Sequence, residues 1–220
     1  MNISRITRTH AEARATYDRL SRWYDLLAAA SERKYVRIGL NLLAPQPGER
    51  TLEIGCGSGY AALKLARTAG DAGLVLALDL STGMLARASA RLARQAGVSS
   101  RPHLVCGDGL WLPLRSASLE AIFLSFTLEL FDTPEMPCLL GECRRVLRTG
   151  GRLAVVALAR QEPPGPAIRL YEFAHARFPR LVDCRPIYPS QSLMDSGFQV
   201  REVVRRAMWG LPVEIVLACA

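Results

Sequence analysis

Short runs of apolar residues alternate along the chain with segments whose apolar residues recur every three to four positions. The apolar runs are bounded by turn residues, which is typical of strands buried on both faces of a sheet. They span residues 51–54, 74–78, 104–106, 119–126 and 152–158. The helical spacing covers 60–69, 82–96 and 134–147. This alternation predicts an α/β fold whose mostly parallel sheet is covered by helices on both faces.

Two helical segments precede the first predicted strand. Residues 9–29 and 31–43 both have amphipathic spacing, and Ser31 is a candidate N-cap for the second of them. Arginines gather on their polar faces. Tyr24, in the first segment, is compatible either with a ligand contact or with an ordinary aromatic residue of the core.

A proline-rich stretch interrupts the alternation after the fifth strand. Residues 160–190 carry six of the thirteen prolines around one helical segment, 167–178. Loops and insertions on a rigid scaffold commonly determine specificity. A short helix and a closing pair of strands follow, at 190–196, 198–208 and 212–218.

A glycine-rich turn joins the first strand to the helix that follows it. Glu53 lies near the strand end, and Gly55, Gly57 and Gly59 then occupy alternate positions. Glycine allows a tight turn and lets a ligand approach the main chain. The spacing is G-x-G-x-G, whereas a dinucleotide-binding loop has G-x-G-x-x-G. Any one of these glycines is also compatible with an ordinary turn, so the assignment depends on residues downstream.

Carboxylates follow the next two predicted strands. Asp79 ends the second strand, where a carboxylate can accept hydrogen bonds from both hydroxyls of a ribose. Ser81 is placed to cap the helix that comes next. Asp108 lies between Gly107 and Gly109 after the third strand. Alone it is compatible with a simple turn, but beside the two other acids it indicates a shared site.

Four features in this order resemble the motifs of the class I S-adenosylmethionine (SAM) methyltransferases. They are the E-x-G-x-G-x-G loop that begins at Glu53, Asp79-Leu-Ser-Thr-Gly-Met84, Gly107-Asp-Gly109, and Glu142-Cys-Arg-Arg-Val-Leu-Arg-Thr-Gly-Gly-Arg-Leu153. Together they cover about residues 45–158. They look most similar to the ubiquinone/menaquinone-biosynthesis C-methyltransferases and their "type 11" relatives. Thr149 stands where that family usually has proline, which loosens a turn and leaves the rest of the match intact.

The resemblance implies a Rossmann-like, seven-stranded, mostly parallel sheet with an antiparallel last strand. It divides the chain into an N-terminal helical cap, 1–44, and a SAM-binding domain, 45–220, in which 160–190 forms a substrate lid. In that family the glycine loop holds the methionine end of the cofactor, Asp79 the ribose and Asp108 the adenine. The residues implied to contact SAM, or S-adenosylhomocysteine as product, are Tyr24, Glu53, Gly55, Cys56, Gly57, Gly59, Asp79, Leu80, Met84, Gly107, Asp108, Gly109, Ser125 and Phe126.

The methyl acceptor is less defined by the sequence than the cofactor. Leucine, phenylalanine and tyrosine in the lid favour a small apolar or aromatic molecule. If the acceptor is a carbon or oxygen acid, a general base assists the reaction. His175 is the first candidate, because the unperturbed pKa of histidine lies near neutrality; the alternative is a surface residue of the lid helix. Asp183 and Glu129 are weaker candidates.

Composition is that of a globular protein, with 50% hydrophobic and 22% charged residues. The six cysteines lack paired ligand spacing, which predicts buried thiols, no disulfides and no metal site. The first residues, 1–14, are polar and basic, and the chain lacks a stretch of about 20 apolar residues, so neither a secretory signal nor a membrane span is expected. We therefore expect a cytoplasmic protein, monomeric or homodimeric.

The net charge of +8 leaves other functions open. The arginines are scattered, which favours a solvated basic surface over a nucleic-acid site. Basic N-terminal helices would suit peripheral membrane contact, so a phospholipid N-methyltransferase is the main alternative. A second is a SAM-binding protein without turnover. A nucleic-acid methyltransferase is disfavoured, because Ser125-Phe-Thr-Leu replaces its N/D-P-P-[YF] motif. The glycine spacing disfavours a nicotinamide-dependent dehydrogenase.

Overall fold

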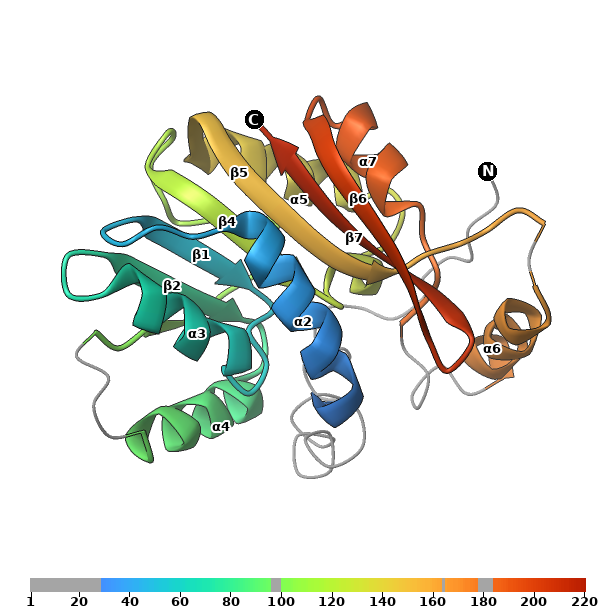
Figure 1. Ribbon diagram of the computed structural model, residues 1–220, viewed down its shortest axis with the longest axis horizontal. Helices are drawn as coiled ribbons and strands as arrows, with labels where there is room; N and C mark the ends of the chain where they lie inside the picture. Colours follow the sequence, from blue (N-terminus) through green and yellow to red (C-terminus); the bar gives the residue numbers. More distant parts are fainter. Residues whose placement is uncertain (1–28, 96–99, 164, 178–183) are drawn as a thin grey trace.

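The computed structural model describes residues 29–95, 100–163, 165–177 and 184–220 (Figure 1). Within these ranges, seven strands form one sheet in the order β3-β2-β1-β4-β5-β7-β6. The strands are β1 (Arg50–Ile54), β2 (Leu74–Asp79), β3 (His103–Cys106), β4 (Leu119–Ser125), β5 (Leu147–Leu158), β6 (Gln199–Met208) and β7 (Leu211–Cys219). The first five strands are parallel to one another. This confirms the predicted fold class.

The strand direction changes at the end of the sheet that β7 and β6 form. β7 is antiparallel to both β5 and β6, as the sequence predicts for the last strand. Because β6 reverses again, it runs in the same direction as β5. The turn between β6 and β7, at Trp209 and Gly210, therefore lies at the edge where the parallel strands have their carboxyl ends. In α/β sheets this is the edge that binds ligands.

Helices cover both faces of the sheet (Figure 1). On one face lie α2 (Ala29–Leu43), α3 (Tyr60–Ala69) and α4 (Thr82–Ala93), and on the other lie α5 (Met136–Val146) and α7 (Pro189–Asp195). The remaining helices are the 3-10 turn η1 (Leu128–Leu130) and α6 (Pro166–Arg177), which follows β5. Apolar side chains fill a separate core on each face, as expected for strands buried on both sides.

Helix α2 packs closely onto the sheet at Gly39. A Cβ atom at this position would lie 2.7 Å from the Val156 side chain and 2.9 Å from the ring of Phe123. Even alanine would therefore push the helix away from β4 and β5. This close contact fixes α2 above the carboxyl half of the sheet.

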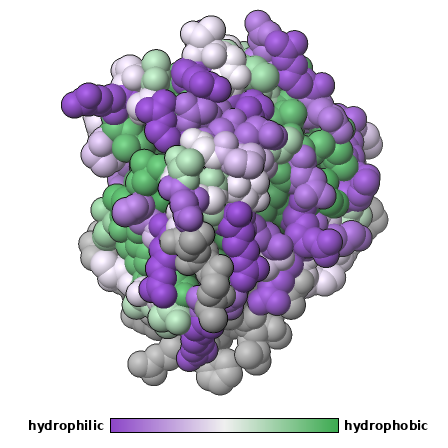
Figure 2. Space-filling model, turned by 60° about the vertical axis from the view of Figure 1, so that its left-hand side comes forward, coloured by the Kyte–Doolittle hydropathy of each residue, from purple (hydrophilic) through white to green (hydrophobic). Residues whose placement is uncertain are grey.

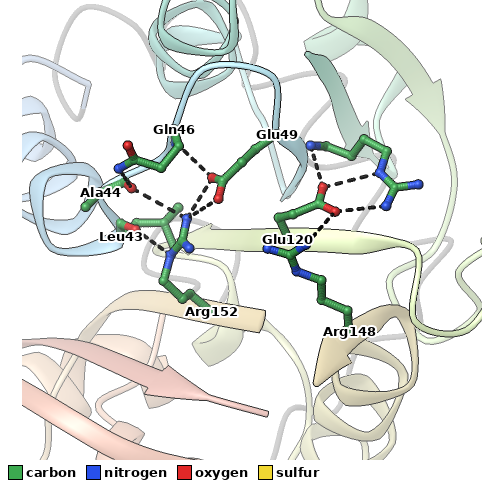
Figure 3. A network of polar contacts seen from close by, with 8 residues as sticks. Leu43, Ala44, Gln46, Glu49, Glu120, Arg148 and Arg152 are labelled. Atoms are coloured by element: carbon green, nitrogen blue, oxygen red, sulfur yellow. Dashed lines mark hydrogen bonds and ion pairs between the residues drawn. The ribbon is translucent and has the colours of Figure 1, made fainter. Parts of the chain in front are cut away.

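Ion pairs at the amino ends of the strands fasten the end of α2 (Figure 3). Arg152 on β5 donates from Nε to the carbonyl of Leu43 at 2.9 Å and from Nη2 to Glu49 at 2.7 Å. Beside them, Glu120 accepts from Arg50 at 2.8 Å. These contacts join α2, β1, β4 and β5 at the edge opposite the ligand edge.

Several element boundaries differ from the sequence prediction. Ser31 lies inside α2 and does not cap it, whereas Ser81 does cap α4, accepting from the Met84 amide at 3.1 Å. The helix expected over 134–147 ends at Val146, because Leu147 already pairs with the start of β4.

One side of the surface is mostly hydrophilic. The left-hand side of Figure 1 comes forward in Figure 2, where hydrophilic side chains predominate between smaller apolar areas. In the described part of the chain, no helix combines the length and apolar character required to cross a membrane.

Candidate active site

A pocket opens at the carboxyl ends of β1, β2 and β4. Here the connection from β1 leads to β2 on one side, and the later connection from β3 leads back to β4 on the other side of β1. Such a reversal of strand order creates a crevice in doubly wound sheets. Most of the residues expected to contact the cofactor line it: Glu53, Gly55, Cys56, Gly57, Asp79, Leu80, Met84, Gly107, Asp108, Gly109, Ser125 and Phe126. The chain thus brings residues from the ends of four strands, β1 to β4, together, as the motif order predicts.

The three glycines of the loop have different roles, although all have positive φ angles. A Cβ on Gly55 would overlap Thr127, with Cγ2 only 2.5 Å away. A Cβ on Gly57 would meet no atom within 4 Å, so this backbone is open to the pocket that it lines. Gly59 is the N-cap of α3 and lies against Ala88 of α4, outside the residues that line the pocket. Its missing side chain therefore serves helix packing.

Asp79 connects the glycine loop to the start of α4. Its Oδ2 accepts from the Gly57 amide at 2.7 Å, and its Oδ1 accepts from the Ser81 amide at 2.9 Å. These two bonds place both carboxylate oxygens beside the pocket that Asp79 lines. The arrangement fixes the carboxylate plane at the mouth between β1 and β2.

Asp108 lies in the next loop, which packs on the first two. The Gly107 amide donates to the carbonyl of Asp79 at 3.1 Å, and Asp108 Oδ1 accepts from the Leu110 amide at 3.0 Å. A Cβ on Gly109 would come within 2.8 Å of the Leu139 side chain. The two aspartates are thus held in rigid loops on the same wall of the pocket.

Glu53 is a buried acid at the floor of this pocket, only 2% exposed. It accepts a hydrogen bond from the Ala62 backbone amide in the first turn of α3. Its Oε2 has no hydrogen-bond partner among the described residues. Desolvation by burial, with a smaller contribution from Asp79, raises the pKa of this carboxyl well above its usual value. An orphaned buried carboxyl oxygen in a pocket fits a cationic ligand, such as the sulfonium and ammonium groups of SAM.

The raised pKa of Glu53 has a testable effect on stability. Without ligand, the carboxyl keeps its proton to a higher pH in the folded chain than in the unfolded chain, so the free energy of unfolding should fall as pH rises from the ordinary value of 4.5 toward the raised value. We expect Glu53→Gln to remove this fall, because the amide keeps a carbonyl for the Ala62 amide and carries no charge. Urea unfolding without ligand, between about pH 5 and pH 8, measures the difference.

Glu120 offers a control of opposite sign. Arg50 lowers the pKa of the Glu120 carboxyl by hydrogen bonding, so its contribution is present above the usual pKa range and is lost as pH falls. Glu120→Gln should therefore flatten the acid limb of the stability profile and lower stability at higher pH by an amount that does not change with pH. Parallel pH profiles for wild type and Glu53→Gln would contradict a protonated Glu53.

Phe126 bounds the pocket in a strained conformation. Its φ of 50° is unusual for a bulky residue and ends β4 one residue earlier than the sequence predicts. Tyr35 of α2 contacts its ring edge-on, with the centroids 6.3 Å apart and the planes at 88°. Tyr35 also donates from its hydroxyl to the carbonyl of Ala207 at 2.5 Å. Strain of this kind persists where the surroundings hold it, commonly at functional sites.

The structure adds pocket residues that the motifs do not identify. Helix α2 supplies Glu32, Arg33 and Val36, and the start of α3 supplies Tyr60. Arg33 and Lys64 lie over the Tyr60 ring, 5.3 and 5.4 Å from its centroid. Of these added pocket residues, Tyr60 is the one that the sequence could have indicated, because it directly follows the glycine loop. The others depend on how α2 crosses the sheet.

Other predicted residues lie elsewhere. Tyr24 and Asp183 fall outside the described residues. His175 is on α6, 9% exposed, and does not line the pocket. Glu129 is fully buried on η1, where its Oε1 accepts from the Leu158 amide at 3.1 Å. The fold thus gathers the predicted cofactor residues around one pocket, whereas the described candidate bases, His175 and Glu129, lie outside its lining.

Comparison with known proteins identifies the class to which this fold and pocket belong. Residues 51–151 match the "Methyltransferase domain" family. The chain belongs to the class I SAM-dependent methyltransferases, as its motifs predict. Within that class it is of the type of the ubiquinone/menaquinone biosynthesis C-methyltransferases.

Two relatives and one solved structure illustrate the likeness. A 2-phytyl-1,4-naphtoquinone methyltransferase of Synechococcus elongatus is 33% identical over 156 residues, covering 71% of this chain and 64% of the relative. A demethylmenaquinone methyltransferase of Beutenbergia cavernae is 36% identical over 163 residues, covering 71% and 62%. The chain thus spans less than two thirds of either relative. Magnesium protoporphyrin IX methyltransferase of Synechocystis shares the fold, with a TM-score of 0.73 at 17% identity over 96% of this chain and 99% of that one.

Proposed function

We propose that this protein transfers the methyl group of SAM to a small, quinone-type aromatic acceptor. The observation that carries the proposal is the pocket at the switch point, where Glu53, Asp79 and Asp108 converge on the glycine loop. The names of the two relatives above support the class of acceptor. The proposed reaction forms a bond from an acceptor carbon or oxygen to the methyl carbon, breaks the sulfur–methyl bond and releases one proton.

The residues of the pocket fit SAM in three parts. The open backbone of Gly57 would receive the methionine end, with Glu53 beneath it. Asp79 would accept from the ribose hydroxyls and Asp108 from the adenine amine, since both carboxylates line the pocket. When bound, SAM supplies an activated methyl group on a sulfonium. The chain's contribution is then mainly to orient the two reactants and to exclude water.

The acceptor side of the pocket would be formed by the residues after β4. Ser125, Phe126 and Thr127 line the pocket at this strand end, and Leu130 and Phe131 follow from η1. Aromatic and apolar side chains with a few hydroxyls suit a flat aromatic ring that carries oxygen substituents. Since α6 follows β5 at the same edge, residues 160–190 are proposed as the lid over this side.

His175 is proposed as the general base that takes the acceptor's proton; because it is buried on α6 and does not line the pocket, this role requires α6 to bring it to the acceptor. If so, His175→Ala should lower kcat by about 100-fold or more and remove one limb of its pH profile, with cofactor affinity unchanged. His175→Gln is the matched control, because it keeps a polar side chain without a titrating ring. A normal pH profile in both variants would contradict the role and leave positioning as the sole contribution of the chain.

The experiment that tests the proposed function has two parts. Calorimetric titration of the wild type with S-adenosylhomocysteine is expected to show binding. Labelled SAM is then supplied with a reduced naphthoquinone, a simple phenol or phosphatidylethanolamine vesicles. Methylation of the quinol supports the proposal, whereas methylation of the phospholipid alone favours a lipid N-methyltransferase. Binding without transfer to any acceptor favours a regulatory protein, and absence of binding contradicts the methyltransferase function.

A further inference from the structure

Two elements at the ligand edge expose large apolar side chains to solvent. On α6, Leu170 and Phe173 are 70% and 67% exposed, and in the turn between β6 and β7 Trp209 is 71% exposed. A single exposed apolar residue is ordinary, but a group on adjoining elements marks an interaction site. None of the three residues lines the pocket described above.

The two elements lie side by side. The inner residues Ile168 and Tyr171 of α6 belong to the same hydrophobic cluster as Met208 and Leu211, which flank the turn. Figure 1 shows α6 next to this turn at the lower right of the molecule. Leu170 and Phe173 lie on the opposite face of α6 from Ile168, toward solvent. The two elements are therefore neighbours at the ligand edge, and both present apolar side chains to solvent.

Exposed arginines accompany the apolar residues. We define the α6–hairpin surface by its exposed members: Arg169, Leu170, Phe173, Arg177, Arg206 and Trp209. Two acids on the adjoining elements, one on α6 and one on β7, are engaged in ion pairs: Glu172 with Arg160 at 2.7 Å, and Glu214 with Arg205 at 3.0 Å. Since the whole chain carries +8, this surface combines apolar projections with positive charge.

Such a combination fits one kind of partner better than others. At a bilayer surface, tryptophan, phenylalanine and leucine enter the boundary between headgroups and acyl chains, while arginines bind lipid phosphates. A second copy of this chain fits less well, because a two-fold contact sets the same patch against itself and brings arginines together. A nucleic acid would stack on the aromatic rings but would gain little from Leu170.

We propose that the α6–hairpin surface docks this protein onto anionic lipid bilayers. The proposal concerns a different part of the chain from the basic N-terminal segment, and it does not require methyl transfer. Because α6 and the hairpin turn lie at the same edge as the pocket, docking turns that edge toward the lipid. If the proposed function is correct, an apolar acceptor can then reach the pocket from the membrane.

Vesicle co-sedimentation of the full chain tests the proposal. We expect binding to phosphatidylcholine vesicles that contain about 30% phosphatidylglycerol, weaker binding to pure phosphatidylcholine, and a decrease with added salt. The variant Leu170→Ala/Phe173→Ala/Trp209→Ala should lose at least tenfold in partition coefficient. Arg169→Gln/Arg206→Gln should lose about fivefold per arginine, on anionic vesicles only.

Trp111→Ala is the matched control. This residue is 79% exposed and follows β3, at the opposite end of the strand order from β6, so its removal should leave vesicle binding unchanged. S-adenosylhomocysteine affinity and thermal melting, measured on every variant, show that each is folded. They also separate a failure of docking from a failure of the proposed function.

A second measurement does not depend on the triple variant. The chain has three tryptophans, so Trp23→Phe/Trp111→Phe leaves Trp209 as the one fluorophore of its kind. Its emission should shift to shorter wavelength on anionic vesicles and be quenched by brominated acyl chains. An unshifted emission, or wild-type vesicle binding by the triple variant, would overturn the proposal. A difference in oligomeric mass between the triple variant and the wild type without lipid would also overturn the proposal, because it would assign the surface to self-association.

Discussion

Gly55→Ala is expected to destabilise the fold by about 3 kcal/mol or more, which lowers the melting temperature by roughly 6–12 °C for a chain of this size. The left-handed backbone at φ 71° costs a non-glycine residue about 1–2 kcal/mol. The added Cβ also overlaps Thr127, whose own Cβ would be 3.0 Å away. Overpacking of this kind costs a further 1–3 kcal/mol or so. Urea unfolding monitored by circular dichroism measures the total.

A double-mutant cycle with Thr127→Ala isolates the overlap. Removing Oγ1 and Cγ2 of Thr127 takes away the two nearest atoms, so the double variant should be more stable than the sum of the single effects predicts. Gly57→Ala is the matched control within the loop, since its Cβ would meet nothing within 4 Å. Gly57→Ala should lose only the free energy that the left-handed backbone costs a non-glycine residue. Its affinity for S-adenosylhomocysteine should fall at least tenfold. Equal stability of the Gly55 and Gly57 variants would contradict the packing argument.

Asp79→Ala is expected to weaken S-adenosylhomocysteine binding by about 1.5–3 kcal/mol, which is the usual effect of removing a hydrogen bond to a charged group. The loss combines two causes, because Asp79 also holds the Gly57 amide at 2.7 Å and the Ser81 amide at 2.9 Å. Asp79→Asn should lose less, since its amide oxygen can still accept one of these bonds. Calorimetric titration at constant pH and salt measures both variants.

Asp71 provides the control for Asp79. It is an exposed acid in the turn after α3, and Asp71→Ala removes the same charge without a pocket contact. Its affinity should equal that of the wild type. If both alanine variants lose affinity alike, the effect of Asp79 is one of overall charge, and its assignment to the ribose fails.

The sequence predicts the parts of the site that depend on local chemistry. Gly55, Gly57 and Asp79 each follow a strand that a short apolar run defines, so their common edge follows from parallel topology alone. The structure places these residues on one pocket, with Asp79 bonded to the Gly57 amide. This bond could not be read from the spacing, because it depends on the angle at which the loop leaves β1.

Long-range packing accounts for what the sequence does not predict. Glu32 and Arg33 line the pocket because Gly39 lets α2 approach the sheet closely, and no local motif records this crossing. Phe126 has a positive φ and packs against Tyr35, far away in the chain, and no local motif indicates either feature. For His175 the helical pattern is correct, but helical periodicity does not determine which side chains face a pocket on another element.

The ion-pair network at the amino ends of the strands has a consequence for how this protein can change. Arg152, Glu49, Arg50 and Glu120 hold four elements together at the edge opposite the pocket (Figure 3). Anchoring and chemistry therefore occupy opposite ends of the same strands. Substitutions around the acceptor side do not touch the ion pairs that attach α2. We therefore expect substrate specificity to change by mutation while the fold stays stable. In directed evolution, the loops after β4 and β5 are the places to randomise, and the network is the part to leave intact.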